Sequence, residues 1–202
     1  MKLFFAAASP FVRKVVMVAK EAGLDSRLER VDAATSPINP NAELAKANPV
    51  KKIPALALDD GSVLFDSPVI CEYLDSLHGG AKMFPSGPAR WEALRLQAGA
   101  DGLMDAAVAA RYETALRPED KRWPEWVDGQ LGKIDGALDD FEARAGSFGD
   151  RVDIGTISVA CALGYLDFRY AHRDWRPGRP KLVAWFEAFG KRPSFQQSKP
   201  PA

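Results

Sequence analysis

The sequence predicts an α/β domain followed by an all-helical domain, a fold class of the α/β plus all-α type. Residues 1–77 show strand, helix and strand patterns, and then two strands and a helix. Residues 78–88 contain three glycines and two prolines, which is typical of a linker. The apolar patterns in residues 89–202 have helical spacing, and 202 residues are enough for two compact domains.

The chain opens with a βαβ pattern. Residues 3–6 form a short apolar run that predicts a strand, and residues 11–22 have apolar groups at helical spacing before Gly23, a common residue after a helix end. Residues 28–31 alternate like a second strand. The stretch that follows is rich in Pro, Asn and Ala, so we expect a loop with one short helix at residues 43–47.

A ββα pattern completes the first domain. Residues 53–58 predict a strand, and Asp59-Asp60-Gly61 is a hairpin turn signal, so residues 63–65 are expected to return antiparallel. Asp66-Ser67-Pro68 then opens a helix, because acceptor side chains at the cap and a proline in the first turn favour a helix start. The apolar face of this helix consists of Val69, Ile70, Tyr73, Leu74 and Leu77.

The second half of the sequence predicts a helical bundle. Long amphipathic helices are expected around residues 94–108 and 126–141, and a last one at residues 182–189. Residues 154–170 are apolar on nearly every side, which predicts the central buried helix. Asp153 and Thr156 lie three residues apart at its start and suggest a cap that nucleates the helix without contacting a ligand.

Composition excludes several classes of protein. Lys plus Arg and Asp plus Glu both number 27, so no net charge attracts nucleic acid or an anionic membrane. No apolar run approaches the roughly 18 residues that span a bilayer, and residues 3–8 are too short for an export signal. Cys71 and Cys161 have no metal-ligand or CxxC spacing, so we expect two buried, reduced thiols, no metal site and a cytoplasmic protein.

Three short segments carry possible chemistry. Ser9 follows a predicted strand, and a predicted helix begins directly after it. It therefore either caps that helix or helps to hold an anion at the positive end of the helix dipole. Ile53-Pro54 at a strand start suggests a backbone bend, sometimes with a cis bond that leaves the Ile53 backbone open to a peptide-like ligand. Asp66-Ser67 offers a carboxylate, a hydroxyl and free N–H groups, which serve either capping or ligand binding.

The three segments together, in this order and followed by a helical domain, resemble the glutathione S-transferase family over essentially the whole chain. The resemblance implies a thioredoxin-like first domain that binds glutathione and a helical second domain. The Arg192-Pro193-Ser194-Phe195 ending also looks like that family's second domain. The segments that carry the likeness are Ser9-Pro10-Phe11-Val12-Arg13, Asn48-Pro49-Val50-Lys51-Lys52-Ile53-Pro54 and Phe65-Asp66-Ser67-Pro68-Val69-Ile70.

The resemblance also implies roles for single residues. Ser9 would donate its hydroxyl to the glutathione sulfur as the catalytic residue, and Ile53 would pair its backbone with the cysteinyl unit. Asp66 and Ser67 would hold the γ-glutamyl amine and carboxylate. Lys52 would lie near the glycyl carboxylate, and Phe11 is counted with the glutathione-binding residues.

The resemblance further implies an electrophilic substrate between the domains and a homodimer. Residues of the first helix of the second domain are expected to line the electrophile's site; they are Met104, Val108, Arg111 and Tyr112. Arg90, Trp91 and Asp101 are candidates for the dimer surface. The expected activity is conjugation of glutathione to small, largely apolar electrophiles in detoxification.

Two positions depart from the family pattern, and two other functions stay open. Lys51 stands where the family commonly has Gly, and Thr156 stands where it usually has Asp. One alternative is a glutathione-binding or partner-docking module of the same fold with little catalysis. The other is thiol-disulfide exchange or peroxide reduction by a catalytic Cys, which fits poorly because the position that would need Cys is Ser9.

Overall fold

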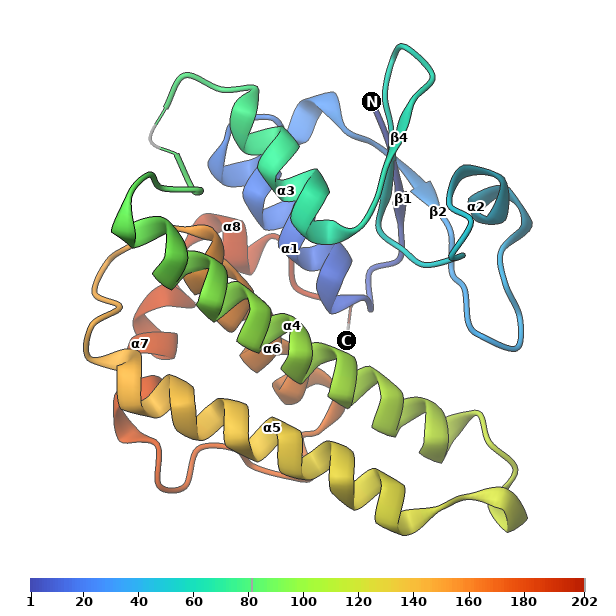
Figure 1. The fold of residues 1–202 in the computed structure, drawn as a ribbon, viewed down its shortest axis with the longest axis vertical. Coiled ribbons are helices and arrows are strands. Elements are labelled where there is room, and N and C mark those ends of the chain that lie inside the picture. The colour runs from blue at the N-terminus through green and yellow to red at the C-terminus, as the bar shows by residue number, and fades with distance from the viewer. Residues whose placement is uncertain (81, 202) are drawn as a thin grey trace. The chain divides into compact units, whose positions relative to one another are not determined.

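A computed structural model describes residues 1–80 and 82–201, and the chain forms two compact units (Figure 1). The first unit comprises Met1–Pro85 together with Pro193–Ala202, and the second comprises Ser86–Arg192. The boundaries at residues 77 and 89 remain a sequence-based prediction. The observed division differs from them chiefly in grouping the end of the chain with the first unit.

The first unit contains a four-stranded mixed sheet. Its strands are β1 (Lys2–Phe5), β2 (Glu29–Asp32), β3 (Ala55–Ala57) and β4 (Val63–Leu64), in the order β2-β1-β3-β4. The first two strands are parallel, whereas β3 is antiparallel to both of its neighbours. Parallel neighbours need a crossover, which the helix α1 (Pro10–Glu21) supplies. This βαβ-ββα arrangement confirms the predicted thioredoxin-like fold.

Helices cover both faces of the sheet. The helices α1 and α3 (Ser67–Ser76) pack together on one side, and the short α2 (Ala42–Ala47) lies on the other (Figure 1). Successive side chains of a strand point to opposite faces of the sheet, so neighbouring residues pack against different helices. On the α2 side, Leu44 packs in a cluster with Ala33 and Ala55, against which Phe4 lies. A 3-10 turn at Asp25–Arg27 leads into β2.

The second unit is all helical, as predicted. It contains α4 (Pro88–Ala115), α5 (Pro124–Ala145), α6 (Ile154–Arg169) and α7 (Pro180–Phe189), with a 3-10 turn at Glu119–Lys121. Every residue of α6 from Ile154 to Leu166 is buried, which confirms it as the central helix. Asp153 and Thr156 form a reciprocal capping box at its start, with nitrogen-to-oxygen distances of 2.9 and 3.0 Å.

A glycine lets α4 and α6 approach closely. A Cβ atom added at Gly155 would lie 2.7 Å from the Ala93 carbonyl oxygen and 2.8 Å from the Leu96 Cβ. The packing of these two helices therefore requires a residue without a side chain at this position.

The sequence did not predict the last helix, α8 (Pro193–Gln196), which belongs to the first unit. Arg13 of α1 holds it: the buried guanidinium donates to the Phe195 carbonyl at 3.1 Å and stacks over the Phe195 ring at 4.1 Å. Four residues make about one helical turn, which is too short for a repeating pattern of apolar residues to predict this helix.

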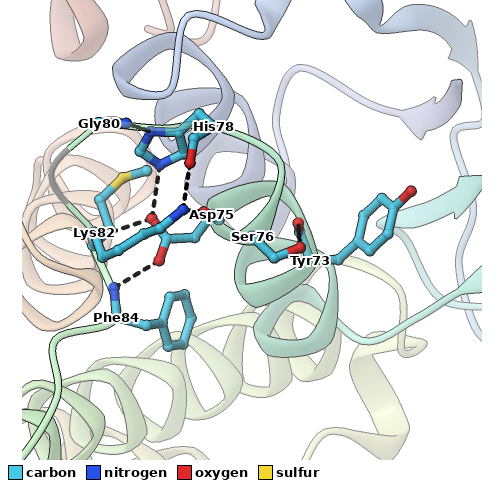
Figure 2. Close-up of polar contacts among 8 residues, drawn as sticks. Tyr73, Asp75, Ser76, His78, Gly80, Lys82 and Phe84 are labelled. Atoms are coloured by element: carbon cyan, nitrogen blue, oxygen red, sulfur yellow. Dashed lines mark hydrogen bonds and ion pairs between the residues drawn. The ribbon is translucent and has the colours of Figure 1, made fainter.

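A buried carboxylate fixes the chain after α3 (Figure 2). Asp75 is 3% exposed and accepts hydrogen bonds from the backbone N–H groups of Met83 at 2.8 Å and Phe84 at 3.1 Å. Its Oδ1 also lies 2.9 Å from the Nε2 of His78, whose Nδ1 accepts from the Gly80 N–H. His78 therefore has a structural role in this turn.

Candidate functional site

The register of the sheet brings the three predicted segments to one edge. Phe4 pairs with Ala55 between β1 and β3, and Leu56 pairs with Leu64 between β3 and β4. When both registers are continued, the end of β1, Pro54 and the end of β4 lie side by side. The segments that carry Ser9, Ile53 and Asp66-Ser67 leave or enter the sheet there, and α1 and α3 both begin at this edge.

Ser9 caps α1 and keeps its proton available. Its Oγ accepts the Val12 N–H at 3.3 Å, so the capping interpretation of this residue is correct. Within the described part of the chain, the Ser9 hydroxyl donates no hydrogen bond. The same hydroxyl can therefore accept from the helix and donate to an anion near the positive end of the α1 dipole.

The loop before β3 presents open backbone groups. The Ile53–Pro54 peptide bond is cis, and no hydrogen bond involves the Ile53 backbone N–H or C=O in residues 1–80 and 82–201. Asn48 is almost fully buried and shapes this loop: its Oδ1 accepts the Val50 N–H at 3.1 Å and its Nδ2 donates to the Lys52 carbonyl at 2.8 Å. The backbone N–H and C=O of Ile53 are therefore available to pair with a peptide-like molecule.

Lys51, which stands where glycine is common in the family, has a left-handed backbone conformation. Its φ is 57°, in the left-handed region that glycine adopts without steric cost. The side chain is exposed, and the Lys51 carbonyl accepts a long hydrogen bond from the Thr35 hydroxyl at 3.4 Å. Lysine is therefore tolerated at this turn, but with backbone strain that glycine would not have.

The start of α3 combines a carboxylate with an unsatisfied hydroxyl. Asp66 is exposed and accepts the Ser67 N–H, as a helix cap does. Ser67 is fully buried, and its Oγ has no hydrogen-bond partner among the described residues. Buried hydroxyl groups are nearly always paired in native proteins, so this Oγ has an unused capacity to form a hydrogen bond with a ligand atom.

The residues predicted for the second substrate lie on α4 of the second unit. Met104 is fully buried, whereas Val108, Arg111 and Tyr112 are partly exposed. Arg111 makes no ion pair with any carboxylate in the described chain. Met104 is therefore a core residue in this structure, and the other three are better placed to meet a ligand.

A second arginine, which the sequence did not single out, belongs with Arg111. Arg169 is the last residue of α6, and its buried Nε has no partner in the described structure. The adjacent Tyr170 donates its hydroxyl to the Ala107 carbonyl of α4 at 2.6 Å, which holds the two helices together one turn before Arg111. No sequence signal identifies Arg169, because a basic residue in the last turn is ordinary in any helix.

The pKa values of two groups beside Arg111 are shifted from their ordinary values. Burial, followed by the charge of Arg111, lowers the pKa of the Arg169 guanidinium. Burial also raises the pKa of Tyr165 to about 12, so its phenol stays neutral at physiological pH.

Neither a metal centre nor a membrane segment was found in the residues that the structure describes. No group of three or more His, Cys, Asp or Glu side chains is placed to hold a metal ion. None of the described helices is both long and apolar enough to cross a bilayer. Cys71 and Cys161 are both buried and do not form a disulfide.

Family models match both halves of the chain: the N-terminal domain of glutathione S-transferase over residues 8–77 and the C-terminal domain over residues 124–188. The uncharacterized GST-like protein YibF of Escherichia coli (strain K12) is 36% identical over 210 residues, covering 100% of this chain and 99% of its own.

Solved structures of a glutathione transferase family member from Pseudomonas fluorescens Pf-5 are also similar. One, with bound glutathione, has 48% identity, a TM-score of 0.97, and coverage of 100% of this chain and 99% of its own. Another, with bound S-(propanoic acid)-glutathione, has 46% identity, a TM-score of 0.92, and full coverage of both chains.

Proposed function

Because the chain belongs to the glutathione S-transferase family, we propose that it binds glutathione and transfers the glutathione thiolate to small, largely apolar electrophiles. The unpaired, buried Oγ of Ser67 carries this proposal, since it lies beside a carboxylate at the start of α3 and lacks only a ligand partner. The similar Pseudomonas fluorescens protein binds glutathione and an S-substituted glutathione, which supports conjugation as the reaction class.

Glutathione binding is assigned to the sheet edge. Ser67 and the first turn of α3 donate hydrogen bonds to the γ-glutamyl carboxylate, and Asp66 accepts from its ammonium group. The Ile53 N–H and C=O pair with the cysteinyl unit. Lys52 is exposed and lies near the glycyl carboxylate, and Phe11 of α1 is partly exposed at the same edge.

The catalytic step needs the thiolate form of glutathione. A free thiol has a pKa near 8.5, and each unit by which a site lowers it corresponds to about 1.36 kcal/mol. We assign this stabilisation to the Ser9 hydroxyl and the α1 N-terminus, both of which favour a negative sulfur. The thiolate then forms a C–S bond with the electrophile and the leaving group departs with its electron pair.

The second substrate and the assembly are parts of the same proposal. Val108, Arg111 and Tyr112 of α4 contact the electrophile, and Met104 supports them from the core. A homodimer is proposed because Trp91 is 70% exposed on α4, which is unusual for so large an apolar side chain. We place the enzyme in the cytoplasm, with detoxification as its role.

Calorimetry with glutathione, together with turnover of 1-chloro-2,4-dinitrobenzene, tests this function. We expect saturable binding and glutathione-dependent release of chloride. Ser9→Ala should lower turnover at least tenfold and leave glutathione affinity nearly unchanged, whereas Ser62→Ala, in the exposed hairpin turn, should change neither. Unchanged turnover in Ser9→Ala would remove the role of Ser9, and the absence of heat with glutathione would favour a docking module.

A further inference from the structure

Arg111 and Arg169 differ from their neighbours in the second unit in having no acidic partner within the described residues. The surrounding arginines are paired with carboxylates on neighbouring turns or helices. These pairs are Arg95 with Asp140, Arg117 with Glu113, Arg122 with Glu119, Arg144 with Glu92 and Asp140, Arg151 with Asp153, Arg173 with Asp135, Arg176 with Asp167 and Asp174, and Arg179 with Asp139. Arg111 and Arg169 thus stand out in a unit in which the other arginines named here all have carboxylate partners.

The helix packing brings the two arginines together. The hydrogen bond from the Tyr170 hydroxyl to the Ala107 carbonyl fixes the end of α6 against α4. Arg111 lies four residues after Ala107, on the same face of α4, and Arg169 immediately precedes Tyr170. The Arg169 guanidinium carbon lies 3.9 Å from the centre of the Phe168 ring, which is within the range of a cation–π contact.

The charges at this site are uncompensated. Arg111 and Arg169 interact electrostatically, and the charge of the first disfavours the charged form of the second. The buried Nε of Arg169 also lacks an acceptor. The negative end of the α6 dipole favours Arg169, but it supplies no partner for that Nε. Arg111 lies before the last turn of α4, so it gains little from the negative end of the α4 dipole. An anion with two oxygens would compensate both positive charges and would give the Arg169 Nε an acceptor.

We propose that Arg111 and Arg169 together bind a carboxylate of the second substrate, so that this enzyme acts on electrophiles that carry an acid group. The inference rests on the proposed transferase function and deepens it. Arginine is suited to this role because its planar guanidinium matches a carboxylate in a bidentate way. The partly exposed Tyr112 and Val108 on α4 then accommodate the uncharged part of the molecule.

Two compounds of nearly the same shape test the assignment: 4-chloro-3-nitrobenzoate carries a carboxylate, and 4-chloro-3-nitrobenzamide carries an uncharged amide in its place. Calorimetry without glutathione compares their binding to the wild type, Arg111→Gln, Arg169→Gln and the control Lys133→Gln. The control removes one positive charge from α5, where the lysine makes no ion pair among the described residues and donates a hydrogen bond to Gln130 at 3.3 Å. We expect the acid to bind at least tenfold more tightly than the amide, and roughly ten- to a hundredfold more weakly to either arginine variant than to the wild type.

Lysine variants at the two positions guard against loss of folding. Arg111→Lys and Arg169→Lys keep the charge and should retain part of the preference for the acid, with unchanged far-UV circular dichroism. Equal binding of acid and amide to the wild type would overturn the proposal. So would acid binding that persists in both glutamine variants.

Turnover with glutathione separates this inference from the proposed function. In the reaction, the sulfur bonds to the ring carbon that carries chlorine, chloride leaves with its electron pair, and the thiol proton passes to solvent. Arginine-dependent acid binding without turnover of either compound would support the anion site and refute the transferase. Equal turnover of acid and amide, unaltered by the arginine variants, would refute the anion site and support the transferase.

Discussion

Replacement of Ser67 by alanine separates a ligand-binding hydroxyl from a structural one. The Ser67 Oγ is buried and has no hydrogen-bond partner among the described residues, so Ser67→Ala breaks no bond of the free protein. Removal of an unsatisfied buried polar atom is neutral or slightly stabilising. The hydroxyl is expected to donate to a ligand carboxylate, and loss of such a charged hydrogen bond costs about 1.5–3 kcal/mol, or roughly ten- to a hundredfold in the glutathione Kd.

The assay pairs urea unfolding with glutathione calorimetry on Ser67→Ala and a matched control. Ser158→Ala is that control, because its buried hydroxyl donates to the Ile154 carbonyl at 2.7 Å. We expect Ser158→Ala to lose up to about 1 kcal/mol of stability with unchanged glutathione affinity. Ser67→Ala should keep its stability and bind glutathione more weakly. A Ser67→Ala variant that loses more than about 1 kcal/mol of stability and binds glutathione normally would refute our interpretation of the unpaired hydroxyl.

Three further predictions concern stability, each measured by urea unfolding. Lys51→Gly should gain about 0.5–1 kcal/mol, because relief of the left-handed φ exceeds the entropy cost of glycine; the neighbouring Val50→Gly should lose stability, and equal losses would contradict us. Asp75→Asn should lose about 2–3 kcal/mol, since its carboxylate accepts two buried N–H groups; a neutral result would exclude that role. The hydrogen bond from Arg173 lowers the pKa of Asp135, so this pair stabilises the fold above about pH 4 and the benefit disappears as the pH falls through the lowered folded-state pKa; Asp135→Asn should flatten that dependence by less than about 1 kcal/mol, and an unchanged slope would argue against it.

Local sequence patterns predicted the elements of the fold because most of them are coded locally. The apolar periods of α4, α5 and α6 and the reciprocal cap of α6 depend on residues within a few turns. The boundaries were less accurate where backbone geometry intervenes. The third strand was expected at residues 53–58 but spans Ala55–Ala57, because proline cannot donate to the ladder at its start.

Features that depend on distant contacts were not visible in the sequence. The α8 helix is held by Arg13, which lies 182 residues before the carbonyl that it binds. The predicted site segments converge because β3 pairs with β1 on one side and with β4 on the other, in registers that place the ends of β1 and β4 beside Pro54. These registers depend on distant strands, so no local sequence pattern predicts them. The partnership of Arg111 and Arg169 is of the same kind, since it depends on how α4 and α6 pack.

An unpaired buried polar atom is evidence for a ligand only when a second feature points the same way. Gln97 Nε2 and Trp185 Nε1 are also buried without partners among the described residues, yet nothing about either marks an ion or peptide site. Ser67 differs because it begins a helix beside the carboxylate of Asp66, and Arg169 differs because a second unpaired cation interacts with it. The chemistry of the expected partner follows from that second feature, because a helix start and an arginine pair each favour an anion. One ligand that carries a γ-glutamyl carboxylate and another that carries an acid group would therefore satisfy both sites.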